Sequence, residues 1–281
     1  MFKNILLPVD FGINTEMAVK KALELSGSAD ALIHLYHVHK THLSLNSFLA
    51  FIWSDASKLK AFVNDDLHYK LLQWKELIET NYPNIKVIAD VEQSNRIQKA
   101  IARKAKEIKA DLIIIGKQSY HKWFTFLNTV SPNKIAKTTG CAVLTFKPGS
   151  IFTKIKSIVV PIGPTIPRRK VELILALKQK FRITIHLVTV ISKKQNANDF
   201  SAYSLLETYR FLKDIVQCPL DHEVLHGENV AKSTFNYAKD IKADMLLVEP
   251  EIETKLSSFP QKHIIDELKP NSKLQILAVQ S

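Results

Sequence analysis

Four short segments of this 281-residue chain recur in the same order further along it, and this internal repeat limits the folds available. The first of them, KNILLPVD, returns as KSIVVPIG, and AKEIKADLIIIG returns as AKDIKADMLLVE. A repeat over such a length indicates a duplicated domain. We therefore predict two domains, 1–148 and 151–281. The paired segments are 3–10 with 156–163, 31–38 with 183–190, 105–116 with 238–249, and 141–146 with 274–279.

Within each copy, short apolar runs alternate with stretches of helical periodicity. The runs are apolar throughout rather than at every second residue, which is typical of strands buried on both faces of a sheet. Strands separated by helices favour right-handed crossovers and a parallel sheet. We therefore predict an α/β protein with two tandem Rossmann-like domains, each a five-stranded parallel sheet with helices on both faces. In the first copy the strands are expected near 4–9, 31–38, 85–91, 111–115 and 141–146.

Composition excludes several classes of protein. The chain has 39 Lys and Arg against 27 Asp and Glu, a net charge of +12 that is spread over both halves and suits acidic partners. It has no helix-turn-helix, zinc-finger or RNP pattern, so we expect no nucleic-acid partner. No apolar run reaches the roughly 18–20 residues that span a bilayer, and the first ten residues predict a strand rather than a signal peptide. With two distant cysteines, a cytoplasmic location is predicted.

The motifs around these strands resemble those of the universal stress protein family, in its tandem form. The carrying segments are KNILLPVD, IHLYHVH, AKEIKADLIIIG and TTGCAVLTF. The resemblance implies a strand order of 3-2-1-4-5 in each domain. It also implies that the two copies pair as an intramolecular pseudo-dimer through their last strands, with a homodimer of chains left open. In one branch of the family it implies ATP binding.

The nucleotide-binding branch carries the pattern G-x2-G-x9-G-[ST] after the fourth strand. Glycines there let the backbone approach phosphates, and a Cβ would hinder that approach. In the first copy only Gly116 matches, because Ser119 and Thr129 replace the other two glycines. Asp10 matches the acidic residue that meets the adenosine part of the ligand, and Val9 precedes it. Val9, Asp10, Gly116, Ser119 and Thr129 are therefore the candidate cofactor-binding residues, in a degraded site.

The second copy departs further from this pattern. Gly163 stands at the position of Asp10, and Glu249 replaces Gly116, where a carboxylate would repel phosphates. We therefore expect no cofactor, with ATP in the first domain as the alternative. No catalytic motif is present, so we predict that the protein is not an enzyme. Four histidines between 34 and 42 lack a completing Cys or acidic residue, and no metal site is expected.

The first copy also carries about 20 extra residues within 39–84, with a helical apolar stripe and several aromatic residues. The function that we predict is a non-catalytic stress-response or regulatory protein that acts by binding a ligand or a protein partner. One alternative is an adenine-nucleotide switch with slow ATP hydrolysis in the first domain, resting on Asp10, Gly116 and the basic, aromatic loop 117–134. Another is an apolar-ligand or protein-partner binder that uses 39–84.

Overall fold

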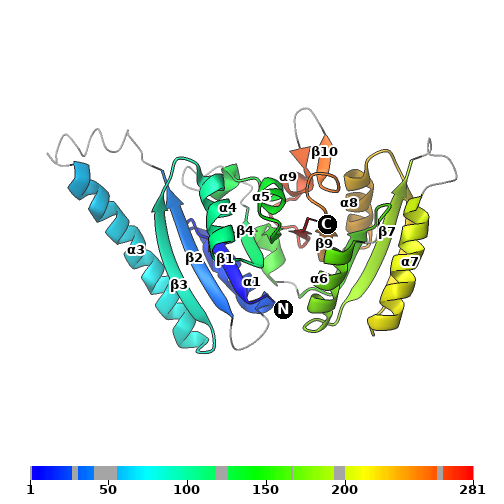
Figure 1. The fold of residues 1–281 in the computed structure, drawn as a ribbon, viewed down its shortest axis with the longest axis horizontal. Coiled ribbons are helices and arrows are strands. Elements are labelled where there is room, and N and C mark those ends of the chain that lie inside the picture. Colours follow the sequence, from blue (N-terminus) through cyan, green and yellow to red (C-terminus); the bar gives the residue numbers. More distant parts are fainter. Residues whose placement is uncertain are drawn as a thin grey trace. The chain divides into compact units, whose positions relative to one another are not determined.

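The computed structural model describes residues 2–26, 31–40, 56–117, 126–152, 154–165, 167–192, 200–257 and 262–280. Their contacts divide them into two compact units (Figure 1). The N-terminal unit holds Phe2–Ile114 and Lys122–Ser131, and the C-terminal unit holds Ile115–His121 and Pro132–Ser281.

The N-terminal unit is built on a parallel sheet with the strand order β3-β2-β1-β4. The long helix α3 packs against one face of this sheet and α4 against the other (Figure 1). Opposite faces are expected, because the crossover to β3 and the crossover to β4 run in opposite directions along the sheet. Its elements are β1 (Asn4–Pro8), α1 (Ile13–Leu25), β2 (Leu32–His39), α3 (Ala56–Asn81), β3 (Lys86–Gln93), α4 (Ile97–Glu107), β4 (Leu112–Gly116, which ends in the other unit) and the 3-10 helix η1 (Phe126–Thr129).

The C-terminal unit contains a sheet with the order β5-β12-β9-β6-β7-β8, parallel except for β5 against β12. A small antiparallel pair, β10 and β11, lies outside it. Its elements are α5 (Pro132–Thr139), β5 (Ala142–Phe146), η2 (Pro148–Phe152), β6 (Ser157–Pro161), α6 (Arg168–Lys178), β7 (Thr184–Ile191), α7 (Phe200–Ile215), β8 (Leu220–His226), α8 (Val230–Asp240), β9 (Met245–Val248), β10 (Lys255–Ser257), β11 (Lys262–His263), α9 (Ile264–Glu267) and β12 (Gln275–Ala278).

The predicted α/β class and the strand order 3-2-1-4-5 are confirmed. Strand β4 runs on into the C-terminal unit, where the Lys117 N–H donates to the Phe146 carbonyl (2.9 Å), so β5 follows β4. The second copy repeats the order as β8-β7-β6-β9-β12. The last strands of the two copies pair with each other, Thr145 opposite Ile276, as the resemblance implied.

An aspartate makes the same hydrogen bonds at the beginning of the central strand in both copies. In the first, the Asp111 carboxylate accepts hydrogen bonds from the N–H groups of Lys3 and Asn4 (2.7 and 3.2 Å). In the second, Asp244 does the same at the start of β6 (2.8 and 3.1 Å). A carboxylate that accepts backbone N–H groups ahead of the ladder satisfies donors that no neighbouring strand reaches. The repeat in the sequence is therefore also a repeat in hydrogen bonding.

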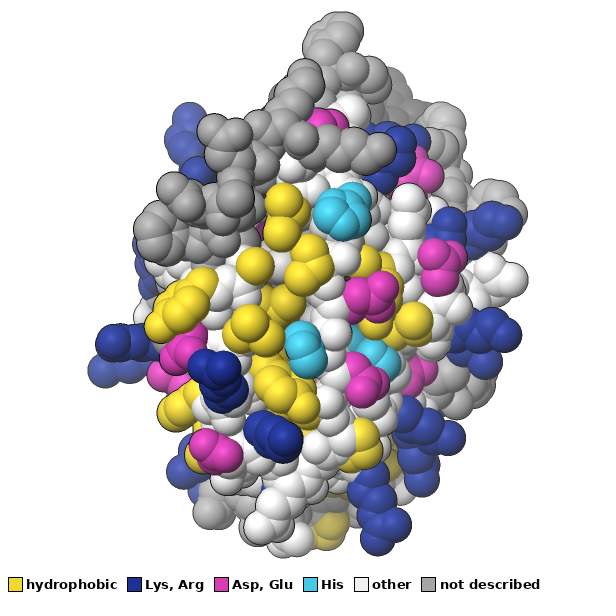
Figure 2. Space-filling view, turned by 90° about the vertical axis from the view of Figure 1, so that its right-hand side faces the viewer, with side chains coloured by type: hydrophobic (Ala, Val, Ile, Leu, Met, Phe, Trp, Pro, Cys, Tyr) yellow, Lys and Arg dark blue, Asp and Glu magenta, His cyan; other side chains and the backbone are white. Residues whose placement is uncertain are grey.

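Apolar residues are not confined to the core. Helix α7 leaves several of them exposed, and Figure 2 shows apolar side chains gathered on the face of the C-terminal unit that carries α7 and β8. Helix α3 does the same in the N-terminal unit with Tyr69, Leu72 and Leu77. Within the described part of the chain, no helix is both long and apolar enough to cross a membrane. The exposed set on α7 is Tyr203, Leu206, Phe211 and Ile215.

Candidate functional site

Asp10 lies just beyond β1 and is almost fully buried, with 9% of its surface exposed. Its Oδ1 atom accepts hydrogen bonds from the Gly12 N–H (3.1 Å) and the Thr15 hydroxyl (3.3 Å). Among the described residues no donor reaches Oδ2, which is also buried. Burial raises the pKa of this carboxyl, against the opposing effect of its hydrogen bonds. Asp10 therefore keeps one acceptor oxygen that none of the described residues uses.

The backbone of Val9, next to Asp10, is held by its neighbours. Its N–H donates to the Tyr36 carbonyl (3.0 Å), and its carbonyl bonds to Nδ1 of His37 (2.8 Å). Burial lowers the pKa of His37 to about 4, so the ring is neutral at pH 7 and Nδ1 carries the donated proton. In the second copy the Thr189 hydroxyl donates to the Ile162 carbonyl (2.9 Å) in the same place. A side-chain donor on the second strand thus holds this carbonyl in both copies.

A hollow of about 510 Å³ opens on the N-terminal unit, lined by Phe11 and by residues of α3. Phe11 forms one wall, with its ring 4.6 Å from the His37 ring and a left-handed backbone (φ 57°). A phenylalanine in that region is strained, and residues with such strain cluster at active sites and ligand-binding sites. The remaining wall comes from α3, within the segment 39–84, and consists of Lys70, Gln73, Trp74 and Leu77.

The remaining predicted site residues are divided between the two units, with Thr129 in the same unit as Asp10 and Gly116 in the other. Thr129 is exposed at the end of η1 in the N-terminal unit. Gly116 is buried at the end of β4, in the part of that strand that belongs to the C-terminal unit. Ser119 and the rest of 118–125, within the loop 117–134, lie outside the described residues. At the position of the hydroxyl in the nucleotide pattern, Val130 is buried and carries no hydroxyl.

In the second copy a buried ion pair lies at the carboxyl ends of β6 and β9. The Lys170 ammonium donates to both carboxylate oxygens of Glu253 (2.8 and 2.6 Å) and to the Pro161 carbonyl (2.7 Å). Glu253 also accepts the N–H of Glu249 (2.6 Å). The two side chains are only 1% and 6% exposed. Sequence reasoning missed this pair, because Lys170 stands among exposed basic residues and nothing in the local pattern marks it.

Two further lysines are buried at the ends of β4 and β5, in the C-terminal unit. Burial lowers the pKa of Lys117 to about 8 and also lowers that of Lys147, while the Asp266 carboxylate acts in the opposite direction on both. A buried cation at the carboxyl end of a parallel sheet can attract an anion. Lys117 adjoins Gly116, so positive charge stands beside the single glycine that matches the nucleotide pattern.

The histidines of β2 form no metal site in the described structure. Over the described ranges, no group of three or more metal-ligating side chains is close enough to hold an ion. Both ring nitrogens of His34 are buried without a hydrogen-bond partner among these residues, and burial lowers its pKa. His37 and His39 stack with ring centroids 6.3 Å apart, which places them on one face of β2. His42 lies outside the described residues.

His37 should make the stability of the protein depend on pH. Its pKa is near 6.5 when unfolded and about 4 when folded, so the unfolded state binds more protons between these values. The free energy of unfolding should therefore rise by roughly 3 kcal/mol from pH 4 to pH 6.5 through this group. His34 acts in the same direction and Asp10 in the opposite one. Urea unfolding at a series of pH values measures the slope.

The control for this prediction is His37→Thr, because Thr189 fills the same role in the second copy. Threonine keeps a donor for the Val9 carbonyl but does not titrate, and the other titrating groups are unchanged. The variant should lose most of the slope between pH 4 and 6.5. An equal slope in both proteins would show that His37 is not protonated on unfolding in this range.

Solved structures with the same fold come from several sources. A universal stress protein from Archaeoglobus fulgidus DSM 4304 is similar with a TM-score of 0.60 and 13% identity, over 99% of this chain and 96% of that one. A protein of unknown function from Pseudomonas aeruginosa PAO1 gives 0.58 and 17%, over 99% and 92%. The cytoplasmic domain of a prokaryotic cation chloride cotransporter gives 0.50 and 11%, over 100% and 96%. At these identities the likeness concerns the fold alone.

No curated protein matches the chain. The model of the universal stress protein family, in contrast, matches residues 1–147, which is slightly more than half of the sequence. This match covers the first copy of the repeat, including both the strands and the segment around Asp10. With the strand order of both copies, it identifies the chain as a member of the universal stress protein family.

Proposed function

We propose that this protein is a non-catalytic stress-response or regulatory protein that acts in the cytoplasm by binding a ligand or partner. In this proposal the ATP site is lost in the second copy and degraded in the first, the domains are 1–148 and 151–281, and any nucleotide would meet the first copy. The residues that would meet it are Val9, Asp10, Gly116, Ser119 and Thr129.

The Lys170–Glu253 pair is the observation that carries this proposal. The Glu253 carboxylate accepts the Glu249 N–H (2.6 Å), and Glu249 stands at the position of the glycine whose backbone would approach a phosphate. An internal carboxylate that is bound to a backbone N–H and a lysine resembles a bound anion in its charge and hydrogen bonds. The second copy therefore supplies from its own side chains the negative group that a nucleotide would bring.

In the first copy the support comes from what surrounds Asp10. The Val9 carbonyl already bonds to His37, and the buried Val130 stands where a phosphate-binding hydroxyl would be expected. Asp10 nevertheless keeps an acceptor oxygen without a described partner, which favours the alternative of weak nucleotide binding. These two observations point in opposite directions, so the nucleotide question is decided by titration.

The experiment is calorimetric titration of ligand-free protein with ATP, ADP and AMP, alongside Asp10→Ala. We expect no heat of binding up to millimolar nucleotide, equivalent to a binding free energy weaker than about −4 kcal/mol. Micromolar ATP binding that Asp10→Ala abolishes would replace this proposal with the nucleotide switch. Slow release of ADP during that titration would add hydrolysis to it.

The hollow lined by Phe11 and α3 favours a second candidate function, an apolar-ligand binder that uses 39–84. Phe11, Trp74 and Leu77 give the hollow an apolar, aromatic lining, and α3 supplies most of its wall. Leu72 and Leu77 of α3 are also 42% and 55% exposed. Ligand sites are concave and are lined mainly by hydrophobic and aromatic side chains. Binding of a fluorescent apolar probe that Trp74→Ala weakens and Leu206→Ala on α7 leaves unchanged would support it.

A further inference from the structure

A pocket of about 960 Å³ opens in the C-terminal unit at the amino ends of β6, β9 and β12, opposite to the carboxyl ends that carry the candidate site. Its floor is apolar and buried, formed by Phe235, Ala238, Leu268 and Leu274 among others. Its volume is within the range of about 300–1,000 Å³ that is common for small-molecule sites. We call it the lysine pocket, after Lys154, Lys156, Lys239, Lys242, Lys269 and Lys273, which line it.

The charge of the lysine pocket is unbalanced. Against six lysines its lining has two carboxylates, Asp244 and Glu267, a net charge of +4. The Asp244 carboxylate accepts hydrogen bonds from two backbone N–H groups. Glu267 forms an ion pair with Lys262, which is not one of the lining residues. Among the residues that the structure describes, none of the six ammonium groups forms an ion pair, and all six lysines are exposed. Like charges held together without counter-charges cost free energy, which a bound anion would recover.

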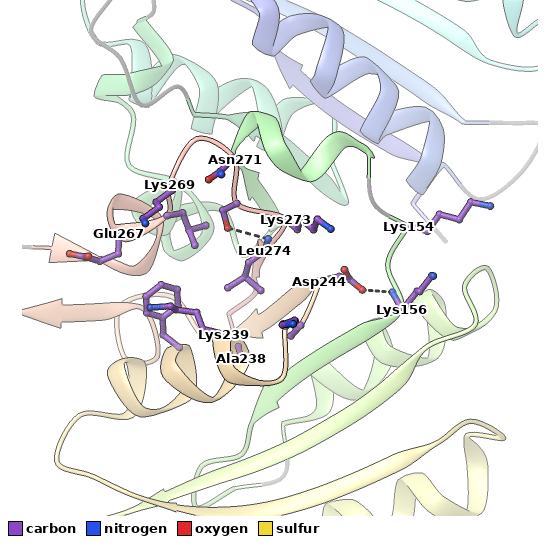
Figure 3. Close-up of a pocket in the computed structure, with 15 residues that line it drawn as sticks. Lys154, Lys156, Ala238, Lys239, Asp244, Glu267, Lys269, Asn271, Lys273 and Leu274 are labelled. Carbon is purple, nitrogen blue, oxygen red and sulfur yellow. Dashed lines mark hydrogen bonds between the residues drawn. The ribbon is translucent and has the colours of Figure 1, made fainter.

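The charges form a row rather than a single cluster. In Figure 3, Lys239 and Lys269 lie at one end of the pocket, Lys154 and Lys156 lie at the other, and Lys273 lies between them. The Lys239 ammonium makes a cation–π contact, because it lies 5.3 Å from the centre of the Phe235 ring. An extended row of cations suits an anion whose charges are also spread along its length.

Comparison with the first copy shows that this row is a property of the second. Lys156, Lys239 and Lys242 correspond in the repeat to Lys3, Lys106 and Lys109, so three lysines are common to both copies. The remaining ones are not, since Lys269 and Lys273 correspond to Ala136 and Gly140, and Lys154 to Met1. Half of the row is therefore shared by both copies, and the other half is present in the second copy alone.

From these observations we infer that the lysine pocket binds a linear oligophosphate, a chain of phosphates without bases. Lysine ammonium groups are compact point charges that bind phosphate oxygens in any orientation. Binding of single-stranded nucleic acid also requires aromatic faces on which bases stack. The aromatic residue of the lining, Phe235, is only 7% exposed and lies beneath Lys239, so the pocket offers charge without a stacking surface.

The test is a calorimetric titration of the phosphate-free full chain with sodium tripolyphosphate at low salt. We compare Lys156→Gln/Lys239→Gln/Lys242→Gln with the matched control Lys3→Gln/Lys106→Gln/Lys109→Gln. The two triple variants remove the same charge from equivalent, exposed positions of the repeat. We expect the first to weaken binding about tenfold and the second less than about twofold. Thermal melting shows whether each variant is folded.

Further arms separate the remaining outcomes. Lys269→Gln/Lys273→Gln should also weaken binding of tripolyphosphate. Asp10→Ala lies in the other unit and should leave that binding unchanged. This inference and the nucleotide proposal can therefore fail independently. Higher salt should weaken binding, since the contacts are exposed charges. Absence of tripolyphosphate binding, an equal loss in both triple variants, or tighter binding of a dT oligonucleotide at the same lysines would each overturn the inference.

Discussion

Lys170→Met should lower the free energy of unfolding of the C-terminal unit by about 3–5 kcal/mol, because it leaves the Glu253 carboxylate buried without its cation. The pair is almost fully enclosed, and the Lys170 ammonium donates to both carboxylate oxygens. Burial raises the pKa of Glu253, whereas the Lys170 charge and the Glu249 N–H act in the opposite direction. Without the lysine, little opposes the effect of burial on the pKa of Glu253. The carboxyl group must then take up a proton, or the surrounding structure must open to admit water. Urea unfolding at pH 7, followed by circular dichroism, measures the loss.

Two controls show whether Lys170→Met destabilises the protein by leaving a buried charge unpaired or only by removing a contact. The double variant Lys170→Met/Glu253→Leu removes both charges and should recover much of the stability, since apolar replacements of a buried pair are often neutral or stabilising. Lys20→Met breaks an ion pair of the same length (2.6 Å), but both its side chains are more than half exposed. It should cost less than about 1 kcal/mol. A loss in Lys170→Met no larger than in Lys20→Met would contradict this account of the site.

Gly149→Ala should be the second most damaging of the substitutions considered, with an expected loss of about 1–3 kcal/mol or more. A Cβ at this position would lie 2.2 Å from the carbonyl carbon of Asn271 and 2.3 Å from its oxygen. The neighbour is backbone, held by a hydrogen bond from the Gly149 N–H to the Pro270 carbonyl (2.9 Å). Neither segment can move aside without breaking that bond. Thermal unfolding of the variant gives the loss as a lowered Tm.

Gly163→Ala is the matched control for Gly149→Ala, because the same methyl group there would meet nothing within 4 Å. The backbone of Gly163 is not left-handed either, so alanine is free of strain. Its Tm should stay the same or rise slightly, as fewer conformations are open to the unfolded chain. If the two variants had equal Tm values, the close approach of the two backbones at Gly149 would be refuted.

The repeat and the apolar runs were sufficient to predict the α/β class and the duplicated domain, because each run signals its own burial without reference to distant residues. Continuous apolar strands such as LIIIG (112–116) can be buried only in a sheet covered on both faces, and the strand order then followed from the family resemblance. The Asp111 and Asp244 contacts were not predicted, although they fall in the repeated segments. Their role depends on which N–H groups a neighbouring strand leaves free.

The site was less predictable, since its chemistry comes from residues far apart in the sequence. Asp10 was found from the family resemblance, but nothing near Lys170 points to Glu253, 83 residues later. The lysine pocket is of the same kind, because six lysines spread over 154–273 have no local pattern and meet only in the folded chain. Sequence periodicity predicts elements, whereas a buried pair or a charged pocket depends on the loops between them.

The antiparallel pairing of β5 with β12 also constrains how the protein can be made. Strand β5 leaves the ribosome about half a chain length before β12 does, and its residues are fully buried in the finished sheet. Until β12 arrives, one edge of an apolar strand has unpaired N–H and C=O groups, which is a template for aggregation. Pairing over such a sequence separation is slow. A nascent chain of this protein would therefore expose that edge until the second copy has been made.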